Sequence, residues 1–338
     1  MKTKENNLGY WIRRFLIEYL IMDKNYSANT QKSYRDTLRI MLPYISEKLH
    51  KKADEILVED VTVNLVLSFL SSIENERKCS VSTRNQRFSA VSSLAKYISS
   101  YCPEYLAWGH SIRNIPIKRA PKTLITYLEK EEINALLNAP NKKTELGRRD
   151  SALLLFLYNS GARVEETALL RVNDLTFPGR NSSGYGIVQM TGKGGKTRRC
   201  PLWSNTCEQL KELANDKNGN EYLFTNRLGE PISRFGIYEI VKKYANQIAE
   251  KYPSILNKRL TPHTIRHTTA THLLQAGVDI NTIRAWLGHV SINTTNIYAE
   301  VNMTMKAKAL EQCTIPGLTA NKKRWKDDKD ILSFLDKL

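Results

Sequence analysis

The segment Arg113–Lys122 (RNIPIKRAPK) constrains the fold more than any other feature of the chain. It carries four basic residues, two prolines and no acidic residue. Because proline lacks a backbone N–H and disfavours helix in the residue before it, we predict an extended linker here. Residues 1–122 hold 20 basic and 12 acidic side chains, and residues 123–338 hold 31 and 22, so both parts are basic (+8 and +9). We therefore predict two basic domains that together bind a polyanion, with double-stranded DNA as the first candidate.

Several classes of protein are excluded by the rest of the composition. The uncharged stretches Val61–Ile73 and Ser151–Ala162 have 13 and 12 residues, whereas a membrane helix needs about 20. The N-terminus lacks the apolar core of a signal peptide. The five cysteines are scattered and form no CxxC pair, which favours reduced thiols over a disulfide framework or a zinc site. We expect a cytoplasmic protein without a membrane span.

Residues 1–112 are predicted to form a helical domain. Ser27 is a suitable N-cap for a helix that runs to Ile45, and a second helix is predicted from about Ser82. Basic residues lie beside the apolar stripe of each helix, namely Lys32, Arg35 and Arg39 on the first and Arg84 and Arg87 on the second. We expect these residues to face the phosphates of DNA; the alternative is a solvated charged surface.

The second half of the chain is predicted to combine helices with a small sheet. Helical patterns cover Glu129–Asn138 and Arg148–Tyr158, strand-like runs lie in Gly186–Trp203, and helices resume from Ser204 to about Cys313. The tail ends in an apolar helical face, formed by Ile331, Phe334, Leu335 and Leu338. The expected domains are 1–112, the linker 113–122, a mixed α/β domain 123–316 within a mainly α fold, and a tail 317–338.

The segment Leu260–Val301 begins with a pattern typical of an anion site. Thr261 and Pro262 suit the N-cap and first turn of a helix, which places His263 and Arg266 on one helical face. Since a helix N-terminus attracts anions, an imidazole and a guanidinium there would form a site for one phosphate.

A metal half-site made by His263 and His267 is the alternative for this helix. A zinc protease would need glutamate at position 264, where the chain has threonine. We therefore expect no metal at this site.

The same segment continues with two more candidate residues. Gly288 is predicted to end a short helix, with His289 at its exit, and the next helix carries Tyr298. Taken singly, each could be an ordinary core or surface residue. The ordered set of His263, Arg266, His289 and Tyr298 favours a functional site.

Residues 160–166 (SGARVEE) place another arginine at a predicted turn. Gly161 is expected to end an apolar helix, and Arg163 follows it. An arginine held rigidly at such a point suits a phosphate clamp. The alternative is a local ion pair between Arg163 and Glu166.

Residues 191–198 (TGKGGKTR) are predicted to form a hairpin that carries Lys193. Gly194–Gly195 is a two-residue hairpin signal. The letters GGKT also occur in nucleotide-binding P-loops, but that motif needs glycine at position 190, where Met190 stands. We expect a lysine hairpin that enters a DNA groove, or a plain surface hairpin, and no ATP or other cofactor.

Together these segments resemble the tyrosine recombinase (phage integrase) family, and in particular its two-domain members that resolve chromosome dimers. The stretches PHTIRHTTATHLLQAGVDINTIRAWLGHVSINTTNIYAEV, SGARVEE and TGKGGKTR are similar to the family's C-terminal motif, first arginine box and lysine hairpin. SANTQKSYRDTLRIMLPYI and SVSTRNQRFSAVSSLAKYI resemble its helical core-binding domain. The resemblance covers roughly residues 8–312 and implies a helical core-binding domain followed by a catalytic domain with a small antiparallel sheet.

The resemblance also implies a role for each candidate residue. Tyr298 would be the nucleophile, Arg163 and Arg266 the phosphate clamp, and Lys193 the general acid. His263 would assist proton transfer at the tyrosine, and His289 would donate a hydrogen bond to the phosphate. A 3′-phosphotyrosyl intermediate and a free 5′-hydroxyl would follow, so that strands are cut and rejoined without metal or ATP.

The expected function is therefore site-specific DNA recombination by a homo-tetramer on two duplexes. We favour a mobile-element role, such as integration or transposition. The alternatives are a type IB topoisomerase and a non-catalytic DNA-binding protein with the same fold. Related recombinases pass a C-terminal helix to a neighbouring subunit, and the apolar face of the tail predicts the same here; docking on its own domain is the alternative.

Overall fold

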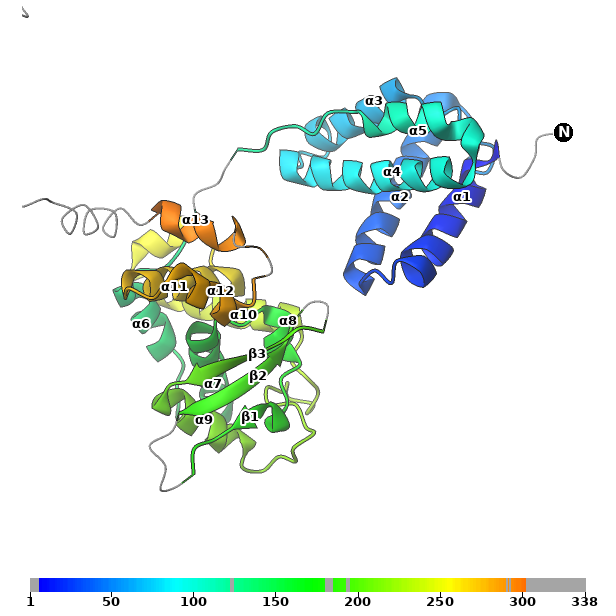
Figure 1. Cartoon of the computed structure of the whole chain (residues 1–338). Helices are drawn as coiled ribbons and strands as arrows, with labels where there is room; N and C mark the ends of the chain where they lie inside the picture. Colours follow the sequence, from blue (N-terminus) through cyan, green and yellow to red (C-terminus); the bar gives the residue numbers. More distant parts are fainter. Residues whose placement is uncertain are drawn as a thin grey trace, which may run out of the picture. The chain divides into compact units, whose positions relative to one another are not determined.

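The computed structural model describes residues 6–121, 125–179, 185–192, 195–289, 291 and 293–301. The chain divides into two compact units, 1–123 and 124–338. Figure 1 shows helices in unit 1, and helices with a small sheet in unit 2. Within the described ranges, no helix combines the length and apolar character that crossing a membrane requires.

Unit 1 is a helical bundle. Its elements are α1 (Leu8–Arg14), the π-helix η2 (Phe15–Asp23), α2 (Ala28–Leu49), α3 (Val63–Asn75), α4 (Val81–Tyr101), the 3-10 helix η3 (Pro103–Tyr105) and α5 (Leu106–Arg113). The hydroxyls of Ser27 and Ser80 cap α2 and α4, as small polar residues do at helix starts. The helices enclose an apolar core that includes Trp11, Phe15 and Phe69.

The basic residues of α2 and α4 differ from the prediction. Lys32, Arg35 and Arg39 on α2 are exposed, as expected. Arg84 is buried instead, and its Nη1 donates to the carbonyl of Pro116. Arg87 donates to the Ser33 carbonyl and the Thr37 hydroxyl. The expectation that Arg84 faces phosphates is therefore wrong, because its side chain is buried; Arg87 is half-buried, and its role stays a prediction.

Unit 2 has helices around a small sheet. Its elements are α6 (Lys130–Asn138), α7 (Glu145–Ser160), α8 (Val164–Ala168), η4 (Val172–Asp174), β1 (Leu175–Thr176), β2 (Gly186–Thr191), β3 (Thr197–Leu202), α9 (Ser204–Ala214), α10 (Arg234–Ile248), η5 (Pro253–Asn257), α11 (Pro262–Gln275), α12 (Ile280–Leu287) and α13 (Asn293–Val301). The strand order is β1-β2-β3, with antiparallel pairing throughout. The predicted mainly α fold with a small antiparallel sheet is confirmed.

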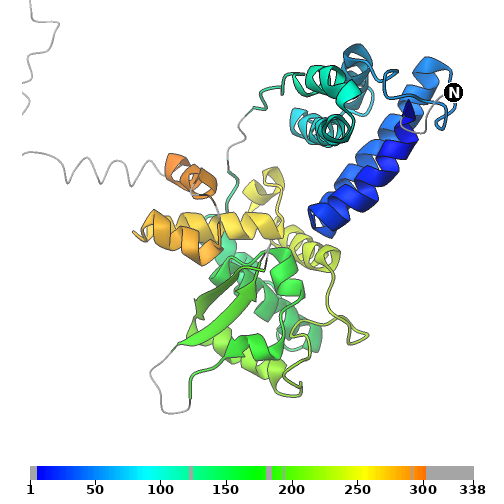
Figure 2. The ribbon, with the colours of Figure 1, turned by 45° about the vertical axis from the view of Figure 1, so that its right-hand side comes forward.

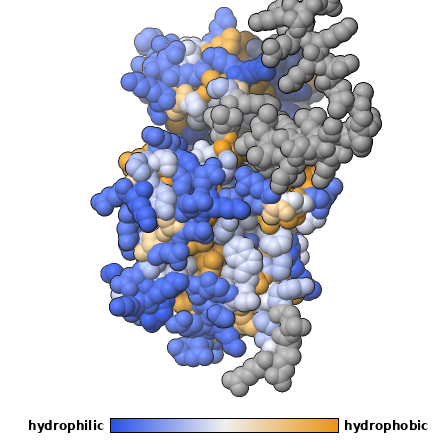
Figure 3. All heavy atoms as spheres, turned by 90° about the vertical axis from the view of Figure 1, so that its left-hand side faces the viewer, coloured by the Kyte–Doolittle hydropathy of each residue, from blue (hydrophilic) through white to orange (hydrophobic). Residues whose placement is uncertain are grey.

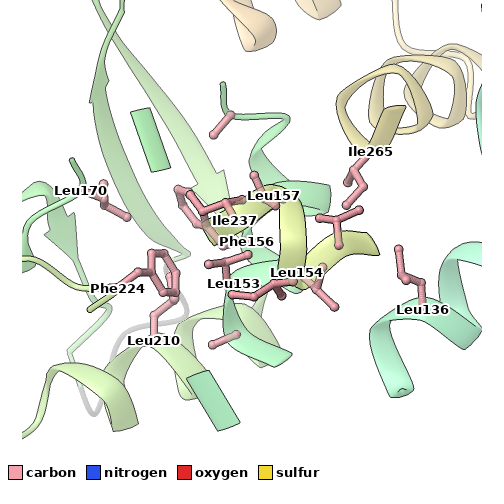
Figure 4. Close-up of a cluster of buried hydrophobic side chains, with 14 of the residues drawn as sticks. Leu136, Leu153, Leu154, Phe156, Leu157, Leu170, Leu210, Phe224, Ile237 and Ile265 are labelled. Atoms are coloured by element: carbon pink, nitrogen blue, oxygen red, sulfur yellow. The ribbon is translucent and has the colours of Figure 1, made fainter. Parts of the chain in front are cut away.

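The core of unit 2 is built around α7. Leu153, Leu154, Phe156 and Leu157 of this helix are all fully buried, and Figure 4 shows them between side chains from the surrounding elements. Figures 1 and 2 both show α11, α12 and α13 gathered at one end of the unit, near an end of the strands. This end of unit 2 holds the candidate residues.

The face drawn in Figure 3 is mostly hydrophilic, with apolar residues scattered among the polar ones. Charged residues make up 25% of the chain, which is a typical share for a folded domain. Among the described residues, the buried apolar side chains form one cluster in unit 1 and two clusters in unit 2.

Gly161 is the glycine on which the local geometry of unit 2 depends most. It ends α7 in the left-handed conformation at φ +57°, and a Cβ built there would lie 2.6 Å from Cδ2 of Leu287 in α12. Only glycine meets both demands without strain.

We therefore expect Gly161→Ala to lower the free energy of unfolding by about 2–4 kcal/mol, as left-handed strain and overpacking add up. Gly229→Ala is the matched control, because Gly229 has φ +77° but no atom near its Cβ position; it should cost only about 1–2 kcal/mol. Urea unfolding of the full chain measures both. An equal decrease in the free energy of unfolding of both variants would show that a Cβ at position 161 is not crowded by Leu287.

Candidate active site

Arg266 ties three elements of unit 2 together. It lies one turn after the N-terminus of α11, which Thr261 caps through the N–H of Thr264. The residue is 2% exposed, and its guanidinium group donates to the carbonyls of Gly161 (2.5 Å) and Leu287 (2.6 Å). Burial, with the nearby cations of Arg163 and Arg198, lowers its pKa to about 9. Arg266 therefore remains a cation at pH 7, held at the ends of α7 and α12.

Arg163 lies beside this group at the start of α8. Its Nη1 donates to Oε1 of Glu166 (2.9 Å), and its Nη2 donates to the carbonyl of Gly288 (3.2 Å). The side chain is 34% exposed. The ion pair that the sequence offered as an alternative is thus present, and the guanidinium still has a surface open to solvent.

Glu166 accepts hydrogen bonds from two arginines. Arg198 on β3 donates to both of its carboxylate oxygens (2.8 and 2.7 Å), and the backbone N–H of Arg163 adds a further bond (2.8 Å). Burial alone would raise the pKa of Glu166, but these hydrogen bonds outweigh it and the pKa is lowered. The carboxylate is therefore ionised at neutral pH and neutralises part of the local positive charge.

Both candidate histidines lie close to these cations. Desolvation, and then Arg266 and Arg163, lower the pKa of His263; the same causes lower that of His289 to about 4. Nδ1 of His289 lies 3.0 Å from the hydroxyl of Thr295. Both imidazoles are therefore neutral at pH 7 and can donate one hydrogen bond each.

Tyr298 is packed inside unit 2. It is 2% exposed and belongs to a small core with Leu274, Ile283 and Leu287. Burial raises its pKa to about 12, and its hydroxyl lies 2.8 Å from Nδ1 of His267. The phenol is therefore neutral at pH 7 and paired with an imidazole.

The sequence predicts no role for His267 other than the alternative of a metal half-site with His263. Desolvation, and then His263 and Arg266, lower its pKa to about 4, so it can accept the tyrosine proton in a hydrogen bond. In the described part of the chain, no group of three His, Cys, Asp or Glu side chains could hold a metal ion.

The structure thus brings five of the six predicted residues to one end of unit 2. They are Arg163, His263, Arg266, His289 and Tyr298. Lys193 lies outside the described residues. The base of its hairpin is described, with Thr191 opposite Thr197, and a Cβ on Gly192 would lie 3.5 Å from Nη1 of Arg163. The tail with Ile331, Phe334, Leu335 and Leu338 also lies outside the described residues.

A groove of 790 Å³ opens beside Arg163. Its lining includes Arg171, Arg234 and the end of β2 from Gln189 to Thr191, followed by Gly192. A larger cavity of 1190 Å³ lies away from the candidate residues, next to Lys211 and Arg227. We regard the smaller groove as the relevant one, because it reaches a guanidinium of the candidate site.

The family models identify both units. Residues 126–305 match the phage integrase family, and residues 12–100 match the N-terminal SAM-like domain of phage integrases. A putative integrase/recombinase, y4rC, from Sinorhizobium fredii is 35% identical over 99% of this chain and 100% of its own length. The tyrosine recombinase XerC of Pelotomaculum thermopropionicum is 33% identical over 86% of this chain and 93% of its own.

A solved structure shows the same fold. The XerH site-specific recombinase, in a post-cleavage complex with its difH substrate, has a TM-score of 0.64 and 22% identity, covering 85% of this chain and 81% of that one. With the family matches over both units, these findings place the chain in the phage integrase family, the tyrosine recombinases.

Proposed function

We propose that this recombinase cuts DNA with Tyr298 while Arg163 and Arg266 hold the phosphodiester under attack. One observation supports the proposal most. Both arginines donate to neighbouring carbonyls at the end of α12, so their guanidinium groups are fixed next to one another. His289 follows Gly288 directly, and Tyr298 packs against Ile283 and Leu287 of α12, so both lie near the same end of this helix as the two arginines.

The cations would supply most of the catalysis. Attack on a phosphodiester places negative charge on the non-bridging oxygens, and preorganised guanidinium groups stabilise that charge. Loss of one such donor typically raises the barrier by ~3 kcal/mol, a factor of 100 or more in rate. The neutral imidazole of His289 would donate a further hydrogen bond. Two cations can thus provide what other enzymes obtain from metal ions.

The bond changes would balance without ATP. The phenol of Tyr298 gives its proton to His263, and its oxygen attacks phosphorus. The bond from phosphorus to the 5′ oxygen breaks, and the leaving oxygen takes a proton from Lys193. A 3′-phosphotyrosyl bond then stores the bond energy. A 5′-hydroxyl from a second duplex gives recombination, and the original hydroxyl restores the strand.

The phenol must lose its proton and leave its present position before it can react. The pKa of about 12 and the 2% exposure of Tyr298 describe a resting state. The hydrogen bond to His267 would be exchanged for an approach to the phosphate when DNA binds. We keep the predicted role of His263 in proton transfer, since its ring centroid lies 4.9 Å from that of His267.

DNA is the proposed partner of both units. The exposed residues Lys32, Arg35 and Arg39 of α2 would contact phosphates in unit 1, and Arg171 and Arg234 would do so beside the site in unit 2. We propose a homo-tetramer on two duplexes in the cytoplasm, with tail 317–338 docked on a neighbouring copy. Topoisomerase activity would need no second duplex, and strand exchange between two duplexes separates the two functions.

Tyr298→Phe should abolish covalent attachment to DNA and leave DNA affinity nearly unchanged, because only the hydroxyl is lost. The DNA sequence is first chosen by binding selection from a randomised pool. Duplexes of this sequence are then prepared with a nick at different positions, so that cleavage next to the nick releases a short fragment with a 5′-hydroxyl and traps the covalent adduct. Denaturing gels detect the adduct. An adduct that persists in Tyr298→Phe would assign the nucleophile to another residue.

Removal of divalent ions should not slow adduct formation, since the positive charge at the phosphate comes from arginines. The same nicked duplexes are incubated with excess chelator, and the adduct rate is compared with that in Mg²⁺. Filter binding at equal ionic strength controls for effects on affinity. A rate that disappears with chelator would refute a metal-free mechanism.

A further inference from the structure

The end of α12 binds three arginines in succession. The carbonyl of Trp286 accepts from Nε of Arg198 (2.9 Å), that of Leu287 from Arg266 (2.6 Å), and that of Gly288 from Arg163 (3.2 Å). Carbonyls in the last turn of a helix have no partner within the helix and attract cations. One short turn therefore fixes the two proposed clamp arginines and a third arginine that the sequence did not single out.

Arg198 differs from Arg163 in its surroundings. Its side chain is only 9% exposed, and its Nε and both Nη atoms donate to Trp286 and Glu166. A Cβ on Gly288 would lie 3.0 Å from Cδ of Arg198, so the arginine packs directly against the turn that leads to His289. Because all three nitrogen atoms of this guanidinium group donate to protein acceptors, the group is not available to bind a phosphate.

Glu166 links Arg198 to Arg163. Its carboxylate is 2% exposed and shared between the two guanidinium groups. If Arg198 no longer occupied both oxygens, the buried carboxylate would attract Arg163 more strongly, since an unpaired buried charge is costly. Arg163 would then be drawn into the protein and away from the groove beside it.

From this geometry we propose that Arg198 is a positioning residue for DNA cleavage. Arg198 donates to both carboxylate oxygens of Glu166 and to the carbonyl of Trp286 at the end of α12. We infer that these bonds leave part of the Arg163 guanidinium exposed to the groove and hold His289 in position. The inference rests on the proposed roles of Arg163 and Arg266.

Arg198→Lys tests the proposal, because lysine keeps the charge but cannot donate in a fixed fork to Glu166 and also to Trp286. With saturating protein and the nicked duplexes above, the adduct rate should fall about 10- to 100-fold, as expected for a misplaced catalytic group. The dissociation constant for the duplex should not change. Arg199→Lys is the matched control: Arg199 is the next residue of β3, is exposed, and should retain the wild-type rate.

A double variant distinguishes a positioning role of Arg198 from a role in protein stability alone. Adding Glu166→Gln to Arg198→Lys removes the negative charge that would draw Arg163 inward, so part of the lost rate should return even though another buried ion pair has been lost. Rates are expressed per molecule competent to bind DNA, which corrects for any unfolded fraction.

Three results would overturn the proposal. They are a wild-type rate in Arg198→Lys, a loss of affinity that accounts for the lost rate, and a double variant slower than Arg198→Lys. If wild-type protein itself forms no adduct, the proposed function fails instead, so the two failures are distinguishable.

Discussion

The carbonyls at the end of α12 hold the candidate site together. Arg266 reaches them from α11, Arg163 from the start of α8, and Arg198 from β3. These elements are far apart in sequence, and a single turn gives each of them a hydrogen-bond acceptor. The left-handed Gly288 completes the turn and places His289 next to the cations.

The electrostatic balance of the site follows from that arrangement. Three guanidinium groups lie together with one buried carboxylate, Glu166, so the cluster keeps a net positive charge. Burial, and then this positive charge, lower the pKa of His289 to about 4, so the imidazole is neutral at pH 7. A neutral imidazole donates a hydrogen bond without adding to the repulsion among cations. Such a cluster suits a phosphate of DNA, whose negative charge would offset the excess.

Much of the fold and site could be predicted from the sequence, because local signals carry them. Ser27 caps its helix as expected, Gly161 ends α7, and Pro262 opens α11. What could not be predicted depends on side-chain direction across elements. Arg84 has the sequence pattern of a surface cation but is buried, and it donates to the carbonyl of Pro116. The pairing of Tyr298 with His267 needs the packing of α13 on α11. The sequence holds one indication of the position of Arg198. It lies two residues before Cys200 on a predicted strand, so its side chain is expected on the same inward face of β3.

The most direct test of the central claim removes the charge that the arginines are proposed to neutralise. The scissile phosphate of the nicked duplex is replaced by an uncharged methylphosphonate, and adduct formation is measured with Arg163→Ala and Arg266→Ala. If each arginine stabilises charge on that phosphate, the variants should react faster with methylphosphonate than with phosphate, whereas the wild type should gain nothing. If neither variant recovers on the neutral substrate, the two arginines do not hold the phosphate that Tyr298 attacks.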